Sequence, residues 1–274
     1  MASSSPASSR PTRPAGLRLL VTGCDGCSHQ HSHRASGRCD PEDACVRAMS
    51  GRLIDRFFRR NPDQAQAYLE DPFWERRAIA CRYAPLEALQ PRLEDRDEVV
   101  RRVVAYRAPL AWLIRLIQDP DRDVRIIVAE HLPSDRLGWA AVDGDYRVRL
   151  VAAQRMPAGK LLPLAADPDR EVRKAVASRL PPFALERLVA DPDPEVRRAA
   201  CERLAPEQAV ALLQDADWRV RHTAAERVPV ESLRALADED PDPLVRETAQ
   251  LRLAGAASNP MNERPAAGRP QPED

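Results

Sequence analysis

A 24-residue repeat is the feature that most constrains how this 274-residue chain can fold. The segment that begins at Asp167 reads DPDREVRKAVASRL, and it recurs as DPDPEVRRAACERL from Asp191 and as DADWRVRHTAAERV from Asp215. The remaining copies begin at Asp71, Asp95, Asp119, Asp143 and, one residue late, at Asp240. Eight copies held in register over residues 71–253 predict a stacked helical array or solenoid.

Each copy has the pattern of one helix followed by a short connecting piece. In the copy from Asp119, the apolar residues Val124, Ile127, Val128 and Leu132 fall on one helical face. We expect the repeating Asp to be the N-cap, and the Pro after it to occupy the first helical position. The segment before the next Asp is too short for a second full helix and predicts a short α or 3₁₀ turn. Prolines close the helix in many copies: Pro133, Pro157, Pro181, Pro206 and Pro229.

Composition narrows the functional classes. Lys and Arg together number 42 and are balanced by 42 Asp and Glu, which argues against a strongly basic nucleic-acid binder. Apolar residues make up 43% but aromatic residues only 4%, so the core should consist of Ala, Val and Leu. No apolar run reaches the roughly 18 residues of a transmembrane helix, so we expect no membrane association.

An arginine follows the repeating Val in most copies. These arginines are Arg77, Arg101, Arg125, Arg149, Arg173, Arg197, Arg221 and Arg246. One interpretation is a basic stripe for nucleic acid. The interpretation we favour is a structural ladder in which each guanidinium bonds an Asp or a carbonyl at a neighbouring repeat junction, because acidic residues accompany the arginine in every copy.

The six cysteines are of two kinds. Cys81 and Cys201 occupy a repeat position that most other copies fill with Ala, so we expect them to be small packing residues without chemistry. The other four, Cys24, Cys27, Cys39 and Cys45, precede the array within 22 residues. Disulfides would require export, which nothing in the sequence favours, so these four predict a metal site. We expect Cys45 to lie in the first turns of a helix that starts at Asp40-Pro41, where a thiolate is favoured. Spacing alone leaves zinc and an iron–sulfur cluster open.

The Asp-Pro-Asp, Val-Arg and Leu-Pro spacing over residues 71–253 resembles the leucine-rich repeat variant family. This resemblance implies an all-α, right-handed, HEAT-like superhelix in which an α-helix alternates with a short 3₁₀ helix. A subset of the family carries an N-terminal cysteine-rich domain that binds a 4Fe–4S cluster. The resemblance therefore implies Cys24, Cys27, Cys39 and Cys45 as ligands of such a cluster, with zinc as the alternative. It also implies a bacterial cytoplasm and a nitrogen-fixation setting.

Residues around the cysteines have weaker assignments. His29, His31 and His33 lie in a Ser-rich loop, and we expect them to be exposed and surplus as ligands. Phe57 and Phe58 should anchor this region on the first repeat, near Tyr68, Phe73 and Trp74. A run of arginines offers a face for an acidic partner, a counter-charge for an anionic cluster, or a solvated surface: Arg47, Arg52, Arg56, Arg59 and Arg60.

The predicted organisation has four parts. Residues 1–16 form a disordered leader, residues 17–70 the cysteine-rich cluster domain, residues 71–254 the eight repeats, and residues 255–274 a disordered tail. Leu19–Cys24 resembles a lipoprotein signal, but the preceding apolar stretch is too short and is interrupted by Arg18.

No constellation of residues resembles an enzyme site, and His131 and His222 occupy positions that other copies fill with unrelated residues. We expect an iron–sulfur protein on a helical-repeat scaffold, acting in electron transfer, redox sensing or docking of a protein partner. The alternatives are a protein-binding scaffold with a structural zinc site, and a helical-repeat nucleic-acid binder.

Overall fold

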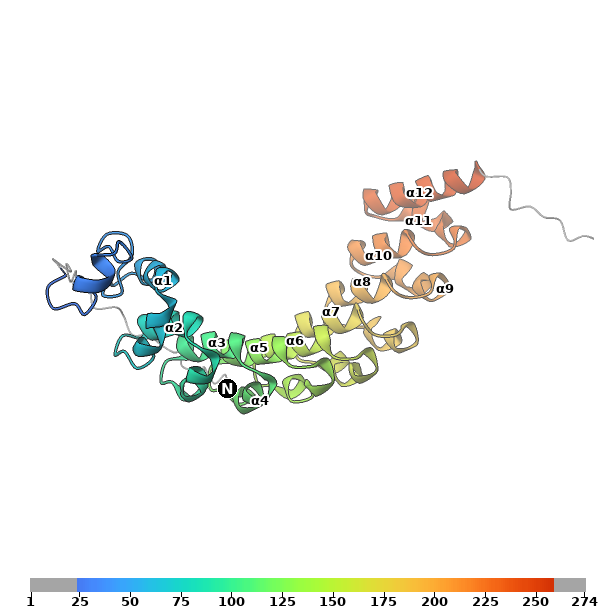
Figure 1. The fold of residues 1–274 in the computed structure, drawn as a ribbon. Coiled ribbons are helices and arrows are strands. Elements are labelled where there is room, and N and C mark those ends of the chain that lie inside the picture. Colours follow the sequence, from blue (N-terminus) through green and yellow to red (C-terminus); the bar gives the residue numbers. More distant parts are fainter. Residues whose placement is uncertain (1–23, 259–274) are drawn as a thin grey trace, which may run out of the picture. The chain divides into compact units, whose positions relative to one another are not determined.

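The computed structural model describes residues 24–258, and within that range the chain is helical without strands (Figure 1). An isolated bridge between Asp40 and Ala44 is its one β-type contact there. None of the described helices has the length and apolar character needed to cross a membrane. The predicted leader and the signal-like segment up to Gly23 lie outside the described residues.

The chain divides into two compact units between Leu116 and Ile117. The cysteine-rich segment and the first two repeats belong to unit 1, so the predicted boundary after residue 70 lies inside this unit. The helical elements of unit 1 are η1 (Gln30–Arg34), α1 (Gly51–Arg60), η2 (Pro62–Tyr68), α2 (Trp74–Tyr83), η3 (Leu86–Glu94), α3 (Glu98–Arg107), α4 (Leu110–Leu113) and η4 (Ile114–Leu116).

Unit 2 contains the remaining repeats. Its elements are α5 (Arg122–His131), η5 (Ser134–Arg136), η6 (Ala140–Val142), α6 (Tyr146–Arg155), η7 (Ala158–Lys160), η8 (Leu162–Ala166), α7 (Arg170–Ala177), η9 (Pro182–Leu188), α8 (Pro194–Cys201), α9 (Pro206–Ala209), η10 (Val210–Gln214), α10 (Trp218–Ala225), η11 (Val230–Leu233), α11 (Arg234–Glu239) and α12 (Pro243–Ala257). Helix α12 runs past the predicted start of the tail at residue 255, and residues 259–274 lie outside the described part.

In each unit, the longer α-helices of successive repeats pack side by side, and the short helices form the connections between them (Figure 1). The predicted alternation of an α-helix with a short α or 3₁₀ turn is therefore confirmed. The short connections arise because a Pro near the end of the α-helix prevents its continuation, as at Pro133 and Pro157.

The buried core has the same 24-residue period as the sequence, because the same repeat positions are buried in successive copies. The predicted helical face of α5 is buried: Val124 and Val128 are fully inaccessible, and Ile127 and Leu132 nearly so. Each following connection adds one buried apolar side chain at the same repeat position, such as Leu137, Leu161 and Leu185. Burial of each such leucine contributes about 1.5–3 kcal/mol, so the array depends on many small, equal layers.

The capping prediction is wrong in one respect. In every copy except the one from Asp71, the second Asp, and not the first, is the N-cap: the Asp121 carboxylate accepts a hydrogen bond from the Val124 N–H at 3.0 Å. The first Asp lies in the preceding turn, where it accepts from the backbone N–H of the second, as Asp119 does from Asp121 at 2.9 Å. The intervening Pro120 therefore precedes the helix and does not occupy its first position.

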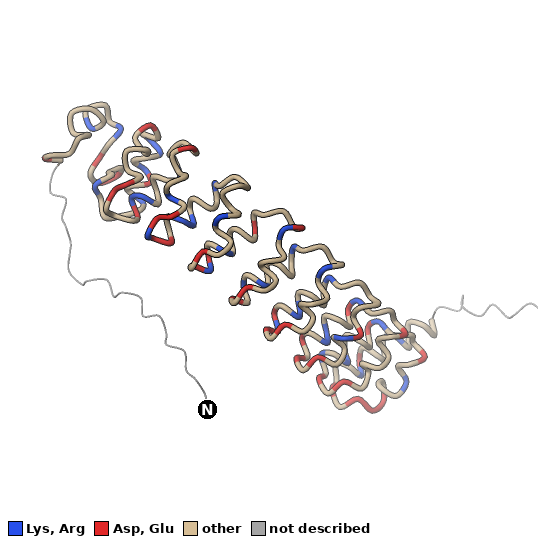
Figure 2. Tube along the Cα trace, turned by 90° about the horizontal axis from the view of Figure 1, so that it is seen from below, with Lys and Arg blue, Asp and Glu red and all other residues tan. Residues whose placement is uncertain are grey.

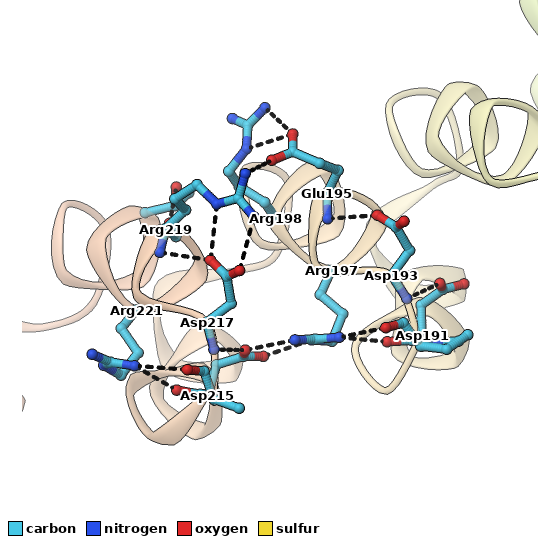
Figure 3. A network of polar contacts seen from close by, with 12 residues as sticks. Asp191, Asp193, Glu195, Arg197, Arg198, Asp215, Asp217, Arg219 and Arg221 are labelled. Atoms are coloured by element: carbon cyan, nitrogen blue, oxygen red, sulfur yellow. Dashed lines mark hydrogen bonds and ion pairs between the residues drawn. The ribbon is translucent and has the colours of Figure 1, made fainter.

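The arginine after the repeating Val forms the predicted structural ladder. Arg197 donates from Nε and Nη2 to both carboxylate oxygens of Asp215 at 2.7 Å, and from Nη1 to the carbonyl of Asp191 in its own repeat at 2.7 Å (Figure 3). This pattern defines the Arg–Asp ladder, whose pairs within the units are Arg77–Asp95, Arg125–Asp143, Arg149–Asp167, Arg173–Asp191, Arg197–Asp215 and Arg221–Asp240.

The ladder charges are buried and stabilise one another. Hydrogen bonds from Arg221 lower the pKa of the Asp240 carboxyl, and the same bonds raise the pKa of Arg221. A planar guanidinium can bond both carboxylate oxygens and a carbonyl at once, which a lysine ammonium cannot match in geometry. The ladder thus joins each repeat to the next through charge-assisted bonds.

A second set of arginines lies at the other end of the α-helices, and the sequence analysis did not single it out. Arg155 donates from Nη1 to the Leu132 carbonyl at 2.9 Å, and Arg179 donates to the Ala153 carbonyl at 2.7 Å. These carbonyls lie at the C-terminal end of the preceding repeat's helix, where they lack intrahelical partners. His131 occupies the same repeat position and contacts the Ile127 carbonyl of its own helix at 2.7 Å.

Acidic and basic residues are interspersed along the repeats of each unit, with acidic residues gathered at the turns (Figure 2). Many exposed charges are themselves paired, such as Arg198 with Glu195 and Glu202. The formal neutrality of the chain is therefore also local.

The ladder predicts unequal effects for two arginines of helix α7. Replacing Arg173 by Ala leaves the Asp191 carboxylate, whose side chain is 4% exposed, without its buried partner, and we expect the free energy of unfolding to fall by about 3 kcal/mol. Replacing Arg170, whose side chain is 64% exposed, should cost less than about 1 kcal/mol. Urea unfolding followed by circular dichroism measures both, and equal losses would contradict the structural role of the ladder.

Candidate metal centre

The four N-terminal cysteines lie on three backbone segments of unit 1. Cys24, Cys39 and Cys45 are buried, and Cys27 is half-buried. All are free thiols. We refer to residues 24–45 as the cysteine loop.

Local backbone geometry brings the first pair into a tight turn. The Cys27 N–H donates to the Cys24 carbonyl at 3.0 Å. Gly26 between them has a φ of 72°, a left-handed conformation that glycine adopts without strain. Turns of this kind allow two sulfur atoms separated by two residues to face one centre.

The second pair is positioned by longer-range bonds. The Cys39 N–H donates to the His33 carbonyl at 3.2 Å, directly after Gly37, whose φ is also 72°. The Cys45 N–H donates to the carbonyl of Leu53 in α1 at 3.1 Å. Helix α1 and the cysteine loop are therefore joined by a backbone hydrogen bond at Cys45.

The electrostatics show that the four thiols share one neighbourhood. Burial is the largest cause that raises the pKa of Cys39 to about 11, followed by the influence of Cys45, Cys27 and Cys24 in that order. Four thiolates at such a place repel one another unless a cation compensates their charge. Soft thiolate ligands favour iron–sulfur clusters and zinc among biological metal groups.

In residues 24–258, no three His, Cys, Asp or Glu side chains already stand in the close arrangement of a metal-bound set. The four thiols nevertheless fit a cluster by their chemistry, their burial and their mutual influence. The loop thus supplies the donor atoms in one region, and closing them around a metal would be coupled to binding.

The prediction of a helix from Asp40-Pro41 is wrong. Residues 40–50 form turns, and the first helix of the region, α1, begins at Gly51. Asp40 still caps locally, since its carboxylate accepts from the Glu42 N–H at 2.8 Å. The bridge with Ala44 folds the chain back within four residues and prevents helix propagation. Cys45 therefore has no helix N-terminus of its own to stabilise a thiolate.

The expectation of three exposed histidines holds only for His31. His29 and His33 are buried, with exposed fractions of 5% and 8%. The His29 Nε2 lies 2.6 Å from the Tyr68 hydroxyl, and its Nδ1 lies 3.1 Å from Nδ1 of His33. Because both ring nitrogens of His29 are engaged inside the protein, its hydrogen bonding is satisfied without a metal.

The aromatic anchor is confirmed in part. Phe57 and Phe58 are fully buried in α1. Phe57 contacts the rings of His29 and His33, while Phe58 contacts Tyr68 and Tyr83. The last partner, from the end of α2, was not predicted.

The arginines of this region are mostly paired within it. Arg56 and Arg60 both bond the Asp43 carboxylate, and Arg59 bonds Asp55 at 2.7 Å. Arg47 donates to the Asp25 carbonyl, next to Cys24, at 3.0 Å. None of the three interpretations offered for this arginine run is tested by these contacts. Arg47 links the cysteine loop to the segment that follows it, and Arg56 links the loop to α1.

The fold and the cysteine loop together define an all-helical repeat protein with an N-terminal cysteine-rich cluster region. A family model described as "LRV protein FeS4 cluster" matches residues 21–67, which include all four cysteines. A model described as "Leucine rich repeat variant" matches residues 170–193 and 218–242.

A solved structure described as a leucine-rich repeat variant with a novel repetitive protein structural motif is 52% identical to this chain. The match covers 84% of this chain and 98% of that chain, with a TM-score of 0.81. The chain belongs to the leucine-rich repeat variant family. Within it, the chain is an iron–sulfur protein on a repeat scaffold, and its indicated cofactor is a 4Fe–4S cluster.

Two other matched structures have little similarity. An engineered protein is 18% identical, with a TM-score of 0.22 and coverage of 72% of this chain and 97% of its own. A chain of the S. pombe condensin Cnd3-Cnd2 subcomplex is 19% identical, with a TM-score of 0.34 and coverage of 78% and 32%. No curated protein matches the sequence.

The two array cysteines are distinct from the loop. Cys81 and Cys201 are fully buried at the repeat position held by Ala105 and Ala129, as predicted. Burial raises the pKa of Cys81 to about 12 and that of Cys201 to about 11.

These pKa values predict selective inertness towards alkylation. Only a thiolate reacts rapidly, so Cys81 and Cys201 should remain unmodified by iodoacetamide in the folded, metal-free protein at pH 8. In denaturant, both should react at the rate of an ordinary thiol. Mass spectrometry of peptides measures the modification, with the half-buried Cys27 as the internal comparison. Rapid native labelling of either array cysteine would contradict its packing role.

Proposed function

We propose that Cys24, Cys27, Cys39 and Cys45 ligate the 4Fe–4S cluster, and that the protein uses it to exchange electrons with a protein partner. The observation that carries this proposal is the common neighbourhood of four free thiols, in the segment that matches the cluster family. When bound, the cluster supplies one-electron redox chemistry. The residues around the four sulfurs then determine how closely water and a partner can approach the cluster.

Burial of the loop is graded, and this gradient supports electron exchange at one edge. Ala44, Val46 and Ala48 are buried around Cys45, and such an apolar shell limits the access of water to a cluster. Cys27, in contrast, is half-buried, and its neighbour Gly26 is exposed. A partner could approach most closely at the Cys24–Cys27 turn, so we assign electron exchange to that edge.

The proposed partner is a protein and not a nucleic acid. The guanidiniums of the Arg–Asp ladder are bonded to carboxylates, so they offer phosphates little free positive charge. Trp218 and Leu244 expose apolar surface on one groove of unit 2, at 40% and 50%, and are suited to a protein surface. We further propose a non-catalytic role in a reducing cytoplasm, where free thiols such as these persist.

The ligand assignment predicts a clear division among six cysteine variants. Cys24→Ala, Cys27→Ala, Cys39→Ala and Cys45→Ala should each abolish stable cluster binding, because a cuboidal cluster needs four thiolates. Cys81→Ala and Cys201→Ala should retain the cluster and serve as matched controls. Iron, sulfide and visible absorption are measured on protein purified without oxygen.

Loss of the cluster from Cys81→Ala, or its retention by a loop variant, would contradict the assignment. Reversible bleaching of the visible absorption by dithionite tests the redox role separately. A cluster that dithionite does not reduce and ferricyanide does not reversibly oxidise would be a structural group and would refute electron exchange.

A further inference from the structure

A buried polar network connects the cysteine loop to η2. Its members are Tyr68, His29 and His33, and we call it the Tyr68 network. The Tyr68 hydroxyl lies 2.6 Å from the His29 ring, and His29 lies 3.1 Å from the His33 ring. Phe57 packs beside both imidazoles, with ring centroids 4.9 and 6.1 Å away. Polar groups enclosed in this way are costly unless every hydrogen bond is made.

The network accounts for the hydrogen bonding of the buried imidazole. A neutral imidazole has one donor and one acceptor nitrogen, and both need a partner when the ring is buried. Tyr68 and His33 engage these two nitrogens. Ser32 adds a second contact to His33, 2.9 Å from its Nδ1. Removal of the Tyr68 hydroxyl alone would leave a buried nitrogen of His29 without its partner.

Along the chain, the two histidines of the network lie between Cys27 and Cys39. His29 follows Cys27 by two residues, and the backbone carbonyl of His33 accepts from the N–H groups of Arg38 and Cys39 at 2.8 and 3.2 Å. The turn η1, Gln30–Arg34, joins the two histidines. A displacement of these imidazoles would therefore be transmitted to the backbone at both Cys27 and Cys39.

A second side chain, Asn61, also holds the backbone next to Cys39. Asn61, at the end of α1, is fully buried, and its Nδ2 donates to the Arg38 carbonyl at 3.0 Å and to the Phe57 carbonyl at 2.9 Å. Asn61 directly precedes η2 and Tyr68 is its last residue. These two side chains hold the cysteine loop next to Cys39 and Cys27. Within the described residues, neither side chain is hydrogen-bonded to a cysteine sulfur, so both act on the loop and not on the metal.

We propose that Tyr68 is a positioning residue for the cluster, which acts through His29 and His33 to hold Cys27 and Cys39 in place before and after the cluster binds. This inference rests on the proposed ligand set. The two buried histidines then serve to maintain the conformation of the cysteine loop. Helix η2, which supplies Tyr68, becomes part of the cluster site.

The test compares two tyrosines that differ in what their hydroxyl holds. Both rings contact Phe58, but the Tyr83 hydroxyl donates to Asp55 at 2.9 Å, away from the cysteine loop. Tyr68→Phe should lose iron to a chelator about 10-fold faster than wild type, as expected for an outer-shell partner of metal ligands. Tyr83→Phe should lose iron at the wild-type rate.

Two further measurements separate positioning from general destabilisation. In the metal-free protein, Tyr68→Phe should accelerate hydrogen exchange at the Arg38 and Cys39 amides, which bond His33, while the amides of α3 stay protected. His29→Gln, whose amide oxygen can accept from the Tyr68 hydroxyl, should retain iron better than His29→Ala. This rescue should vanish in the Tyr68→Phe background, because the donor is absent.

The outcomes distinguish the two proposals. A coloured wild type whose Tyr68→Phe variant keeps its iron and amide protection would overturn the network while leaving the ligand set intact. Equal losses in Tyr68→Phe and Tyr83→Phe, or a rescue by His29→Gln that does not need Tyr68, would also overturn it. A colourless wild type without iron would refute the proposed function and, with it, any role of the network towards a cluster.

Discussion

The bidentate bond between one repeat's arginine and the next repeat's aspartate is the interaction on which the array depends. Each ladder arginine also bonds a carbonyl of its own repeat, so a single side chain joins two consecutive turns. The aspartate in turn accepts from the N–H of the capping aspartate two residues later. Register between repeats, turn geometry and the start of the next helix are therefore specified together. The ladder adds no net charge to the chain, because each arginine of its pairs bonds an aspartate.

At the N-terminal end of the array, the first repeat helix, α2, has no preceding repeat to cover its apolar surface. In unit 1, α1 and η2 pack on α2 in that place, with Phe58 between Tyr68 and Tyr83. The same elements supply Asn61 and Tyr68, which hold the cysteine loop. Helices α1 and η2 thus both cover the end of the array and shape the cluster site. A terminal repeat that must cover apolar surface is a natural place for such an added function.

Periodicity predicted what depends on local sequence and failed where distant residues decide. The apolar face of Val124 and Val128, the small buried position of Cys81 and the ladder arginines all follow from a pattern read within one or two repeats. The N-cap was misplaced because both aspartates of a copy are able to cap, and only the arginine of the preceding repeat selects the first for the ladder. Burial of His29 depends on Tyr68, 39 residues away, and a polar Ser-rich loop carries no local sign of it. Similarly, Asp40-Pro41 has a helix-start pattern, but the contacts of Asp43 with α1 and the bridge to Ala44 favour a compact turn.

The two classes of cysteine show how environment separates chemistry from packing. Cys81 and Cys39 both have a raised pKa, and burial is the largest cause for each. Around Cys81 the further influences are Asp95, which raises the pKa, and three arginines, which lower it: Arg92, Arg107 and Arg77. Around Cys39 the further influences are those of Cys45, Cys27, Cys24 and Asp40, and each of them raises the pKa. A thiolate at Cys39 is thus unfavourable on its own, and a cationic metal centre would offset that cost. The same residue type therefore serves packing in the array and, as we propose, metal binding in the cysteine loop.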